Sequence, residues 1–399
     1  MKRILITGAR APVSIDLSRR LQAAGHEVFV CDSIHFPIGR FTTQRQSFHQ
    51  VAGPRYDSAS FIDELNRIID EHQIDLLIPT SEESFYVSAY QEQLHCRSLI
   101  DSLPLLESLH NKYIFSQTFE NEFASTPRTD LITAAHQLHI FTPQSTQFVF
   151  KPVYSRFASS TLVGPSAQRL SKLEFTPAQS WVAQEKVGGT EVSSFSLANN
   201  GKLLAHASYK TPYRAGQGAG IFFEPHEHIG ILNYAETVLR QTNFTGQIGF
   251  DFIVDSDDHP WVIECNPRAT SGIHLFATDG KLSEAYLSVL ESPADAVDQR
   301  RDEYADYVPM QTDVRMIGAA MPFWGALQGI LRLKPGKFIQ DFRAAKDVLT
   351  SQDDRSPLLY LPLTMAELGF RSLLKLQSLQ ATSTEDMEWN GESLDQKID

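Results

Sequence analysis

Short apolar runs alternate with amphipathic stretches at the start of the chain. Strands are expected at residues 3–7, 27–31 and 75–79, and helices at residues 14–24 and 60–72. Ser14 is the expected N-cap of the first helix. A strand–helix–strand unit this tight predicts parallel strands joined by a right-handed crossover. We therefore expect residues 1–108 to form a doubly wound, parallel-sheet α/β domain.

The pattern changes after about residue 110, where strand signals dominate. Helices are expected at residues 111–122 and 232–243, and strands at residues 147–151, 181–186, 191–198, 202–209, 249–254 and 261–266. Gly188-Gly189 and Asn199-Asn200-Gly201 are strong turn signals between successive strands. Antiparallel strands after a parallel start indicate the α+β class for this part of the chain.

The residues after about 295 differ again. Pro335-Gly336, Ser356-Pro357 and Pro362 break short helical pieces, and we expect the apolar stretch Pro322-Phe323-Trp324 to be buried against the core. Covering an active site, forming a dimer or contacting an apolar substrate are its alternative roles. The fifteen residues from Glu385 hold six acids and a single lysine, which predicts a loose, solvated tail.

Composition excludes several classes of protein. The 399 residues are 42% hydrophobic and 21% charged, as in a globular protein, and the net charge of −13 disfavours a broad nucleic-acid interface. Three distant cysteines exclude a disulfide scaffold and a CxxC zinc site. The longest uncharged run, residues 316–331, is too short to span a membrane, and no signal-peptide pattern is present, so we expect a cytoplasmic protein.

The stretch 249–266 carries the most informative chemistry. If residues 255–260 close a hairpin, Asp251 lies opposite Glu264, and Asn266 lies on the same face opposite Gly249. Two carboxylates this close favour a cation between them, and oxygen ligands suit Mg²⁺ or Mn²⁺. The alternative is the polar face of an exposed hairpin. The apolar face would carry Phe250, Phe252, Val254, Trp261, Ile263 and Cys265.

Other candidates flank this hairpin in the sequence. Arg268 could grip a phosphate or carboxylate, although a surface salt bridge is the alternative. Lys112 and Lys151 stand at element ends and could pair with phosphates, although a lone lysine is more often a solvated surface residue. Backbone groups of residues 184–187 could bind adenine and Glu191 a ribose, unless this is an ordinary β-hairpin.

In order along the chain, these pieces resemble the ATP-grasp superfamily, in particular carboxylate–amine ligases with a carbamoyl-phosphate-synthetase-like or biotin-carboxylase-like core. The resemblance is carried by residues 78–83 (IPTSEE), 110–112 (HNK), 150–153 (FKPV), 184–191 (QEKVGGTE), 249–252 (GFDF) and 264–268 (ECNPR). It covers roughly residues 1–290. It implies a pre-ATP-grasp domain at residues 1–108, a small lid subdomain at 109–180, a catalytic subdomain at 181–295 and an extension at 296–399.

The resemblance also implies a set of ligand contacts. Lys112, Lys151 and Ser155 would contact ATP phosphates, Glu185 and Val187 adenine, and Glu191 ribose, while Asp251, Glu264 and Asn266 would bind Mg²⁺ (or Mn²⁺). Arg268 would steady an acyl phosphate, and Arg214 would hold the substrate carboxylate, unless its glycine-rich stretch is only a surface loop. The loop at residues 154–160 departs from the family because it lacks glycine, although Arg156 could add charge there and Ser155, Ser159 and Ser160 could donate hydrogen bonds. We expect small-molecule carboxylate and amine substrates, such as amino acids or small peptides, and a possible homodimer.

Three other functions stay open. A nicotinamide-dependent oxidoreductase would use Gly8 and Asp32, although Arg10 and Val13 occupy the next two glycine positions of that motif. Bicarbonate activation is an alternative within the superfamily. A non-catalytic binding protein is disfavoured because Asp251, Glu264, Asn266 and Arg268 are all present.

Overall fold

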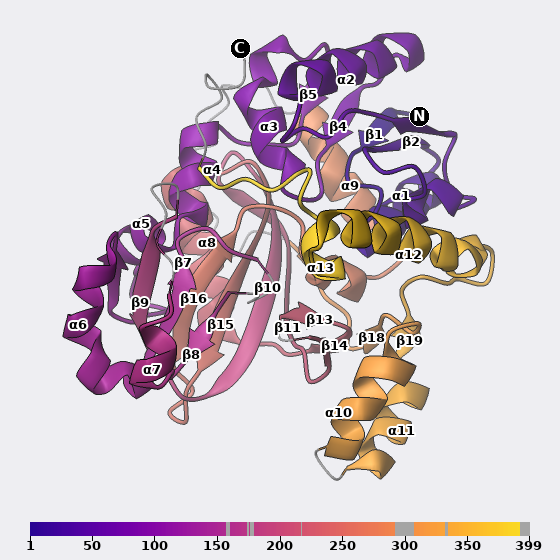
Figure 1. Ribbon diagram of the computed structural model, residues 1–399. Coiled ribbons are helices and arrows are strands. Elements are labelled where there is room, and N and C mark those ends of the chain that lie inside the picture. The colour runs from indigo at the N-terminus through magenta and orange to yellow at the C-terminus, as the bar shows by residue number, and fades with distance from the viewer. Residues whose placement is uncertain are drawn as a thin grey trace.

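The computed structural model describes residues 1–156, 160–173, 175, 179–216, 218–291, 307–331 and 334–391. Ser159 and the acids beyond residue 391 lie outside these residues. The described residues form three larger sheets and a two-stranded ribbon, with helices packed around them (Figure 1). No helix in the described ranges is long and apolar enough to cross a membrane.

The N-terminal unit is the predicted parallel sheet. Its strands are β1 (Arg3–Ile6), β2 (Glu27–Asp32), β3 (Ser47–Gln50), β4 (Leu76–Ile78) and β5 (Arg97–Ser98), in the order β3-β2-β1-β4-β5. Its helices are α1 (Pro12–Ala23), α2 (Ser58–His72), α3 (Glu83–Ala89) and α4 (Leu103–His110). Every strand pair is parallel, which confirms the doubly wound class.

The first helix starts earlier than predicted. Pro12 occupies its first turn and Ala11 its N-cap, because a proline there has the right φ and needs no hydrogen-bond acceptor. The Ser14 hydroxyl instead donates to the carbonyl of Ala11 at 2.7 Å. Ser14 as N-cap is therefore wrong. The second helix is capped as its sequence allows, with the Asp57 side chain accepting from the Ser60 amide.

A small antiparallel sheet follows. It contains β6 (Thr129–Ile132), β7 (Phe148–Pro152), β8 (Leu162–Val163) and β9 (Trp181–Glu185), in the order β6-β9-β7-β8. Its helices are α5 (Lys112–Thr118), α6 (Leu138–Phe141) and α7 (Ala167–Leu170). Phe148, Phe150 and Trp181 are buried in its own core.

The large sheet is mostly antiparallel. It contains β10 (Thr190–Asn199), β11 (Lys202–Lys210), β14 (Phe222–Pro225), β15 (Gly246–Val254), β16 (Pro260–Asn266), β17 (Val308–Pro309), β18 (Arg315–Met316) and β19 (Lys346–Asp347). A short ribbon, β12 (Arg214–Ala215) and β13 (Ala219–Gly220), lies beside it, and α8 (Ile229–Thr242) and α9 (Lys281–Leu287) pack nearby. The strand order β16-β15-β10-β11-β14-β18-β19, with β17 on β11, shows that strands from beyond residue 295 extend this sheet.

The link at Gly188-Gly189 does not form a hairpin. Strand β9 belongs to the small sheet and β10 to the large one, so the link joins two sheets. A Cβ on Gly189 would lie 2.2 Å from the carbonyl oxygen of Val254, and its φ is +156°. The glycine is therefore required by the close approach of β15, and the hairpin interpretation of residues 184–191 is wrong.

The C-terminal part is helical. Its helices are α10 (Ala326–Leu331), α11 (Pro335–Ala344), α12 (Ser356–Lys375) and α13 (Leu379–Thr382). The expected burial of Pro322-Phe323-Trp324 is wrong, because Phe323 is 75% exposed and Trp324 is 45% exposed. They lie in the short π-helix Met321–Gly325 that precedes α10.

A buried histidine in the large sheet gives the fold a pH dependence. His206 on β11 is 6% exposed and contacts the Ser196 hydroxyl through Nδ1. Burial lowers its pKa to about 4 from the usual 6.5. Below pH 6.5 this histidine is protonated in the unfolded chain but stays neutral in the folded chain. The free energy of unfolding therefore falls by about 3 kcal/mol between pH 6.5 and 4. Urea denaturation should show that His206→Gln loses this component, whereas the exposed His95→Gln keeps it. If the free energy of unfolding depended on pH equally in the wild type and both variants, this assignment would be wrong.

Candidate active site at the junction of the two antiparallel sheets

The β15–β16 hairpin brings the predicted carboxylates together. Asp251 pairs with Glu264, and Gly249 pairs with Asn266. Near the turn the register differs by one residue, since Val254 pairs with Pro260 and not with Trp261. A bulge after Asp251, which leaves Ile263 without a partner, restores the predicted pairing. As a result Val262, and not Trp261 or Ile263, is buried on the apolar face.

The bulge connects the two antiparallel sheets. The carbonyl of Ile263 accepts hydrogen bonds from Lys151 Nζ at 3.1 Å and from Gln184 Nε2 at 3.4 Å. Lys151 lies on β7 and Gln184 on β9, both in the small sheet. The extra residue in β16 thus supplies the acceptor that holds the small sheet against the carboxylate hairpin.

Two buried lysines face Glu264. Lys112 Nζ lies 3.5 Å and Lys151 Nζ 3.6 Å from Glu264 Oε2, and each lysine is at most 4% exposed. Lys112 is placed by the start of α5, where the Asn111 side chain accepts from the amides of Tyr113 and Ile114. Burial lowers the pKa of Lys151 to about 8, although the negative charge of Glu264 acts to raise it. Burial would raise the pKa of Glu264, but Lys112 and Lys151 hold it well below its usual range.

Asp251 has the opposite electrostatic environment. It accepts from the Ser193 hydroxyl at 2.5 Å and from Asn266 Nδ2 at 3.0 Å. Burial, followed by the charge of Glu264, raises its pKa. A carboxyl pair in which one member is driven towards protonation is an environment that a cation would stabilise. Within the described ranges, no cluster of three or more His, Cys, Asp or Glu residues has a metal-binding arrangement, so the third donor here would be the amide of Asn266.

Arg268 connects this hairpin to the N-terminal unit. Its Nη2 donates to Asn266 Oδ1 at 3.1 Å, and its Nε lies 3.9 Å from Glu82 Oε1. Glu82 is buried and also forms an ion pair with Arg156 from the loop after β7. Burial would raise the pKa of Glu82, but Arg156 and the neighbouring cations hold it at about 2. The charge that Arg156 was expected to add to this loop is thus directed at Glu82.

The other predicted site residues lie on β9, β10 and the ribbon strand β12, and in the links that follow β7 and β9. Arg214 on β12 forms an ion pair with Glu191 on β10, so these two residues contact each other. Glu185, at the end of β9, is exposed, and its amide donates to the carbonyl of Arg128 at 2.8 Å. Val187 follows in the link to β10. The backbone carbonyl of Ser155 accepts from Lys112 Nζ at 3.2 Å.

A C-terminal segment, residues 383–391, reaches the same region, and sequence reasoning missed it. Trp389 is 2% exposed, stacks on Phe85 and meets Tyr86 edge-on, with ring centroids at 5.7 and 5.1 Å. Its amide donates to Glu82 Oε2 at 3.0 Å, and its carbonyl accepts from Arg156. The loose tail predicted from Glu385 is therefore wrong for residues 385–391. Met387 and Trp389 were the signal, because large apolar residues are out of place in a solvated acidic tail.

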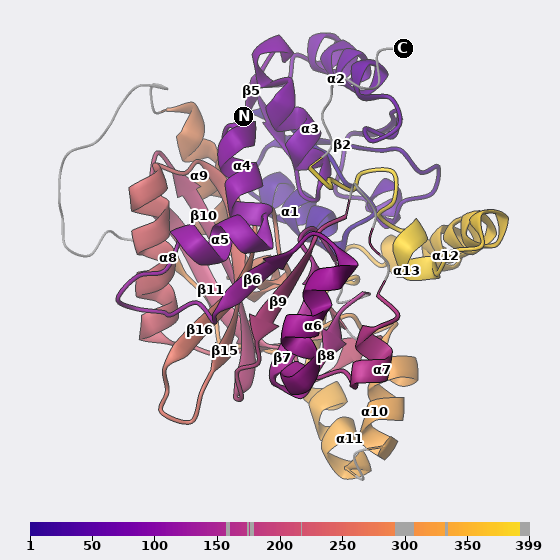
Figure 2. The ribbon, with the colours of Figure 1, turned by 60° about the vertical axis from the view of Figure 1, so that its left-hand side comes forward.

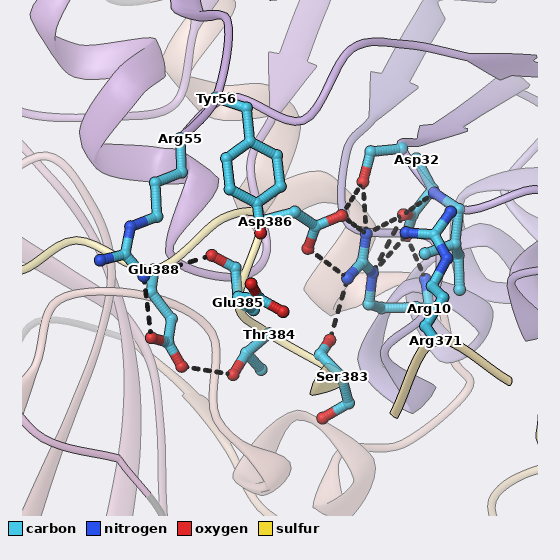
Figure 3. A network of polar contacts seen from close by, with 12 residues as sticks. Arg10, Asp32, Arg55, Tyr56, Arg371, Ser383, Thr384, Glu385, Asp386 and Glu388 are labelled. Carbon is cyan, nitrogen blue, oxygen red and sulfur yellow. Dashed lines mark hydrogen bonds and ion pairs between the residues drawn. The ribbon is translucent and has the colours of Figure 1, made fainter. Parts of the chain in front are cut away.

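The same segment closes a polar network over the first βα turn (Figure 3). Arg10 donates to Asp32 Oδ1 at 2.5 Å and to Asp386 Oδ1 at 2.7 Å, and its side chain is 7% exposed. Arg55 reaches Glu388 at 3.3 Å, and the Ser33 hydroxyl donates to Asp386. Asp32 is therefore engaged by a guanidinium from its own domain.

The comparisons with known proteins agree with this geometry. Residues 109–272 match a family model described as an ATP-grasp domain, and no curated protein matches the chain. N5-carboxyaminoimidazole synthetase from Staphylococcus aureus has a similar fold, with a TM-score of 0.59 at 14% identity over 84% of this chain and 86% of that one. L-amino acid ligase from Bacillus licheniformis gives 0.55 at 15% identity over 73% and 74%. Biotin carboxylase from Campylobacter jejuni gives 0.57 at 12% identity over 74% and 72%.

Fold and family model thus agree with the resemblance drawn from the sequence motifs. The parallel-sheet unit comes first in the chain, and the small antiparallel sheet and the large, mostly antiparallel sheet follow it. The chain carries an ATP-grasp domain over residues 109–272.

Proposed function

We propose that this protein is an ADP-forming carboxylate–amine ligase that uses ATP and Mg²⁺. One observation carries the proposal: Asp251, Glu264 and Asn266 converge with two buried lysines, Lys112 and Lys151, where the two antiparallel sheets meet. Oxygen donors beside ammonium groups suit a metal-bound polyphosphate. Proteins of similar fold support it, since a 2-oxoglutarate carboxylase domain from Hydrogenobacter thermophilus was solved with MgADP.

The residues present fit a hard divalent cation. Asp251 and Glu264 supply carboxylate oxygens, and burial of a like-charged pair favours a cation between them. Asn266 Oδ1 accepts from Arg268 in this structure, so binding a metal through that oxygen would require Arg268 to turn towards another acceptor. An acyl phosphate is such an acceptor. When bound, the cation would neutralise charge on the phosphates.

The chemistry follows from the positions of the cations. A substrate carboxylate oxygen bonds to the γ-phosphorus of ATP while the bond to the bridging oxygen breaks and ADP leaves. An amine then bonds to the acyl carbon, phosphate leaves, and the amine gives up a proton. Lys112 and Lys151 would hold the phosphates in line, and Arg268 would stabilise the acyl phosphate, so catalysis is mainly positioning and charge neutralisation.

The remaining contacts are proposed on the same basis. Glu185 and Val187 would bind adenine through the backbone, Glu191 the ribose and Ser155 a phosphate. Because Glu191 is paired with Arg214, binding would separate them, which frees Arg214 for the substrate carboxylate. We propose amino acids or small peptides as substrates, and the homodimer stays a prediction.

Bicarbonate is the second candidate carboxylate. N5-carboxyaminoimidazole synthetase and biotin carboxylase, both similar in fold, favour this possibility. The phosphorylation step would be the same, with bicarbonate as the attacking oxygen acid.

An oxidoreductase using the N-terminal unit is disfavoured. Asp32, which would bind ribose hydroxyls, is already paired with Arg10 and is fully buried. Gly8 serves a protein contact, since a Cβ there would lie 2.6 Å from the Thr80 hydroxyl and its φ is +70°.

The test is a screen of carboxylate and amine pairs for ADP formation, with Mg²⁺ present. A ligase should release ADP only with both substrates, and hydroxylamine in place of the amine should trap the acyl phosphate as a hydroxamate. ADP formation with bicarbonate alone would favour the second candidate. Absence of any substrate-dependent ADP formation across the screen would contradict both.

A further inference from the structure

Exposed apolar side chains are concentrated in one part of this protein. Of the 25 large apolar residues exposed in the described ranges, 17 lie between residues 323 and 379. They belong to α12, which lies beside the N-terminal unit, to α10 and α11, which project from the molecule beyond β18 and β19, and to the segments beside these helices (Figures 1 and 2). Exposed apolar side chains concentrated on a few helices in this way mark an interaction site.

Helix α12 contacts the protein partly through polar residues and leaves many apolar ones exposed. Its polar side faces the protein: the Thr364 hydroxyl donates to the carbonyl of Phe36, and Glu367 accepts from the amides of His35 and Phe36. Leu368 is buried, but three other leucines point to solvent, with Leu359 72%, Leu373 75% and Leu374 68% exposed. An amphipathic helix normally buries its apolar side, so this helix is oriented for contact with something outside the chain.

The charge of this region limits what that contact can be. Residues 313–376 contain nine Lys and Arg against six Asp and Glu, a net charge of +3, whereas the rest of the chain carries −16. Lys334 and Arg343 are exposed on or beside α11, and the exposed Lys346 forms an ion pair with Asp313. A symmetric dimer through this surface would place two copies of the same cationic patch against each other, which is unfavourable. An anionic lipid surface offers both an apolar layer and negative charge.

We propose that α10, α11 and α12 dock this protein on the surface of an anionic lipid bilayer. The helices would lie in the plane of the interface, because none in the described ranges can span a bilayer. The exposed Trp324 and the neighbouring lysines and arginines suit the boundary between headgroups and acyl chains.

Co-sedimentation of the full chain with vesicles tests this directly. Vesicles of phosphatidylcholine with phosphatidylglycerol should bind the protein, vesicles of phosphatidylcholine alone should bind it at least ~5-fold more weakly, and added salt should weaken the anionic case. The variant Leu359→Glu/Leu373→Glu/Leu374→Glu should lose at least ~10-fold in binding. The control Ile229→Glu, on α8 and itself 68% exposed, should bind as the wild type does.

Other results overturn the proposal. Equal binding to both kinds of vesicle would show that charge does not contribute. No binding to anionic vesicles would show that the surface does not dock on a membrane. If the triple leucine variant bound as the wild type does, the membrane contact would lie on another surface. If sedimentation velocity shows a dimer that the triple variant abolishes, while anionic vesicles bind nothing, a second copy covers this surface. The leucines are exposed, so the variants should keep the wild-type circular dichroism spectrum.

Discussion

Glu264→Gln is expected to lower substrate-dependent phosphate release by at least ~100-fold, because the change removes a negative charge from the proposed metal site. The neutral amide also leaves Lys112 and Lys151 without their shared counter-ion, although each Nζ keeps a carbonyl acceptor. The measurement is phosphate release with a substrate pair from the screen, at saturating ATP and Mg²⁺.

The matched control is Glu284→Gln. Glu284 is an exposed glutamate on α9, so the same chemical change there should leave the rate within about twofold. Circular dichroism should show that both variants are folded. Equal rates for wild type and Glu264→Gln would remove the site assignment.

Trp389→Ala is expected to lower the free energy of unfolding by about 3–5 kcal/mol, as for other large core residues. The ring is 2% exposed and packs on Phe85 and Tyr86, and its loss leaves a cavity between α3 and the C-terminal segment. The hydrogen bonds to Glu82 and from Arg156 use the backbone of residue 389, so an alanine can still make them. Urea denaturation followed by circular dichroism gives the measurement.

Trp324→Ala is the control for this change. Trp324 is 45% exposed, so the same substitution should cost less than about 1 kcal/mol. If Trp389→Ala and Trp324→Ala had equal effects, residues 383–391 would not be a stable part of the fold.

The sequence predicted the parts of the fold that depend on local pattern. The parallel strands of the N-terminal unit, and Asp251 opposite Glu264, follow from alternation of apolar runs and from counting along a hairpin. The count succeeded through two deviations that cancel, a shorter turn and a bulge at Ile263, and neither has a local signal in the sequence.

Contacts between distant segments could not be predicted in this way. The pairing of Glu191 with Arg214 and of Glu82 with Arg156 depends on how separate elements pack, and nothing in either residue's neighbourhood specifies its partner. The acidic character of residues 385–391 suggested solvent, yet Arg10, Arg55 and Arg156 provide the positive charge that makes their burial favourable. Composition alone records the charge of a segment and not that of its surroundings.

The ion pair between Arg10 and Asp386 joins residues 376 positions apart. A ribosome makes Arg10 well before Asp386, so while the residues between them are being synthesised the parallel-sheet unit lacks the segment that caps it. Contacts between such distant residues form late, because a long loop must close first. A nascent chain would therefore complete this corner of the molecule only after residue 389 had emerged. A product terminated before that point would lack the ion pairs to Asp386 and Glu388 and would expose the Phe85 and Tyr86 rings to the cell's quality-control proteases.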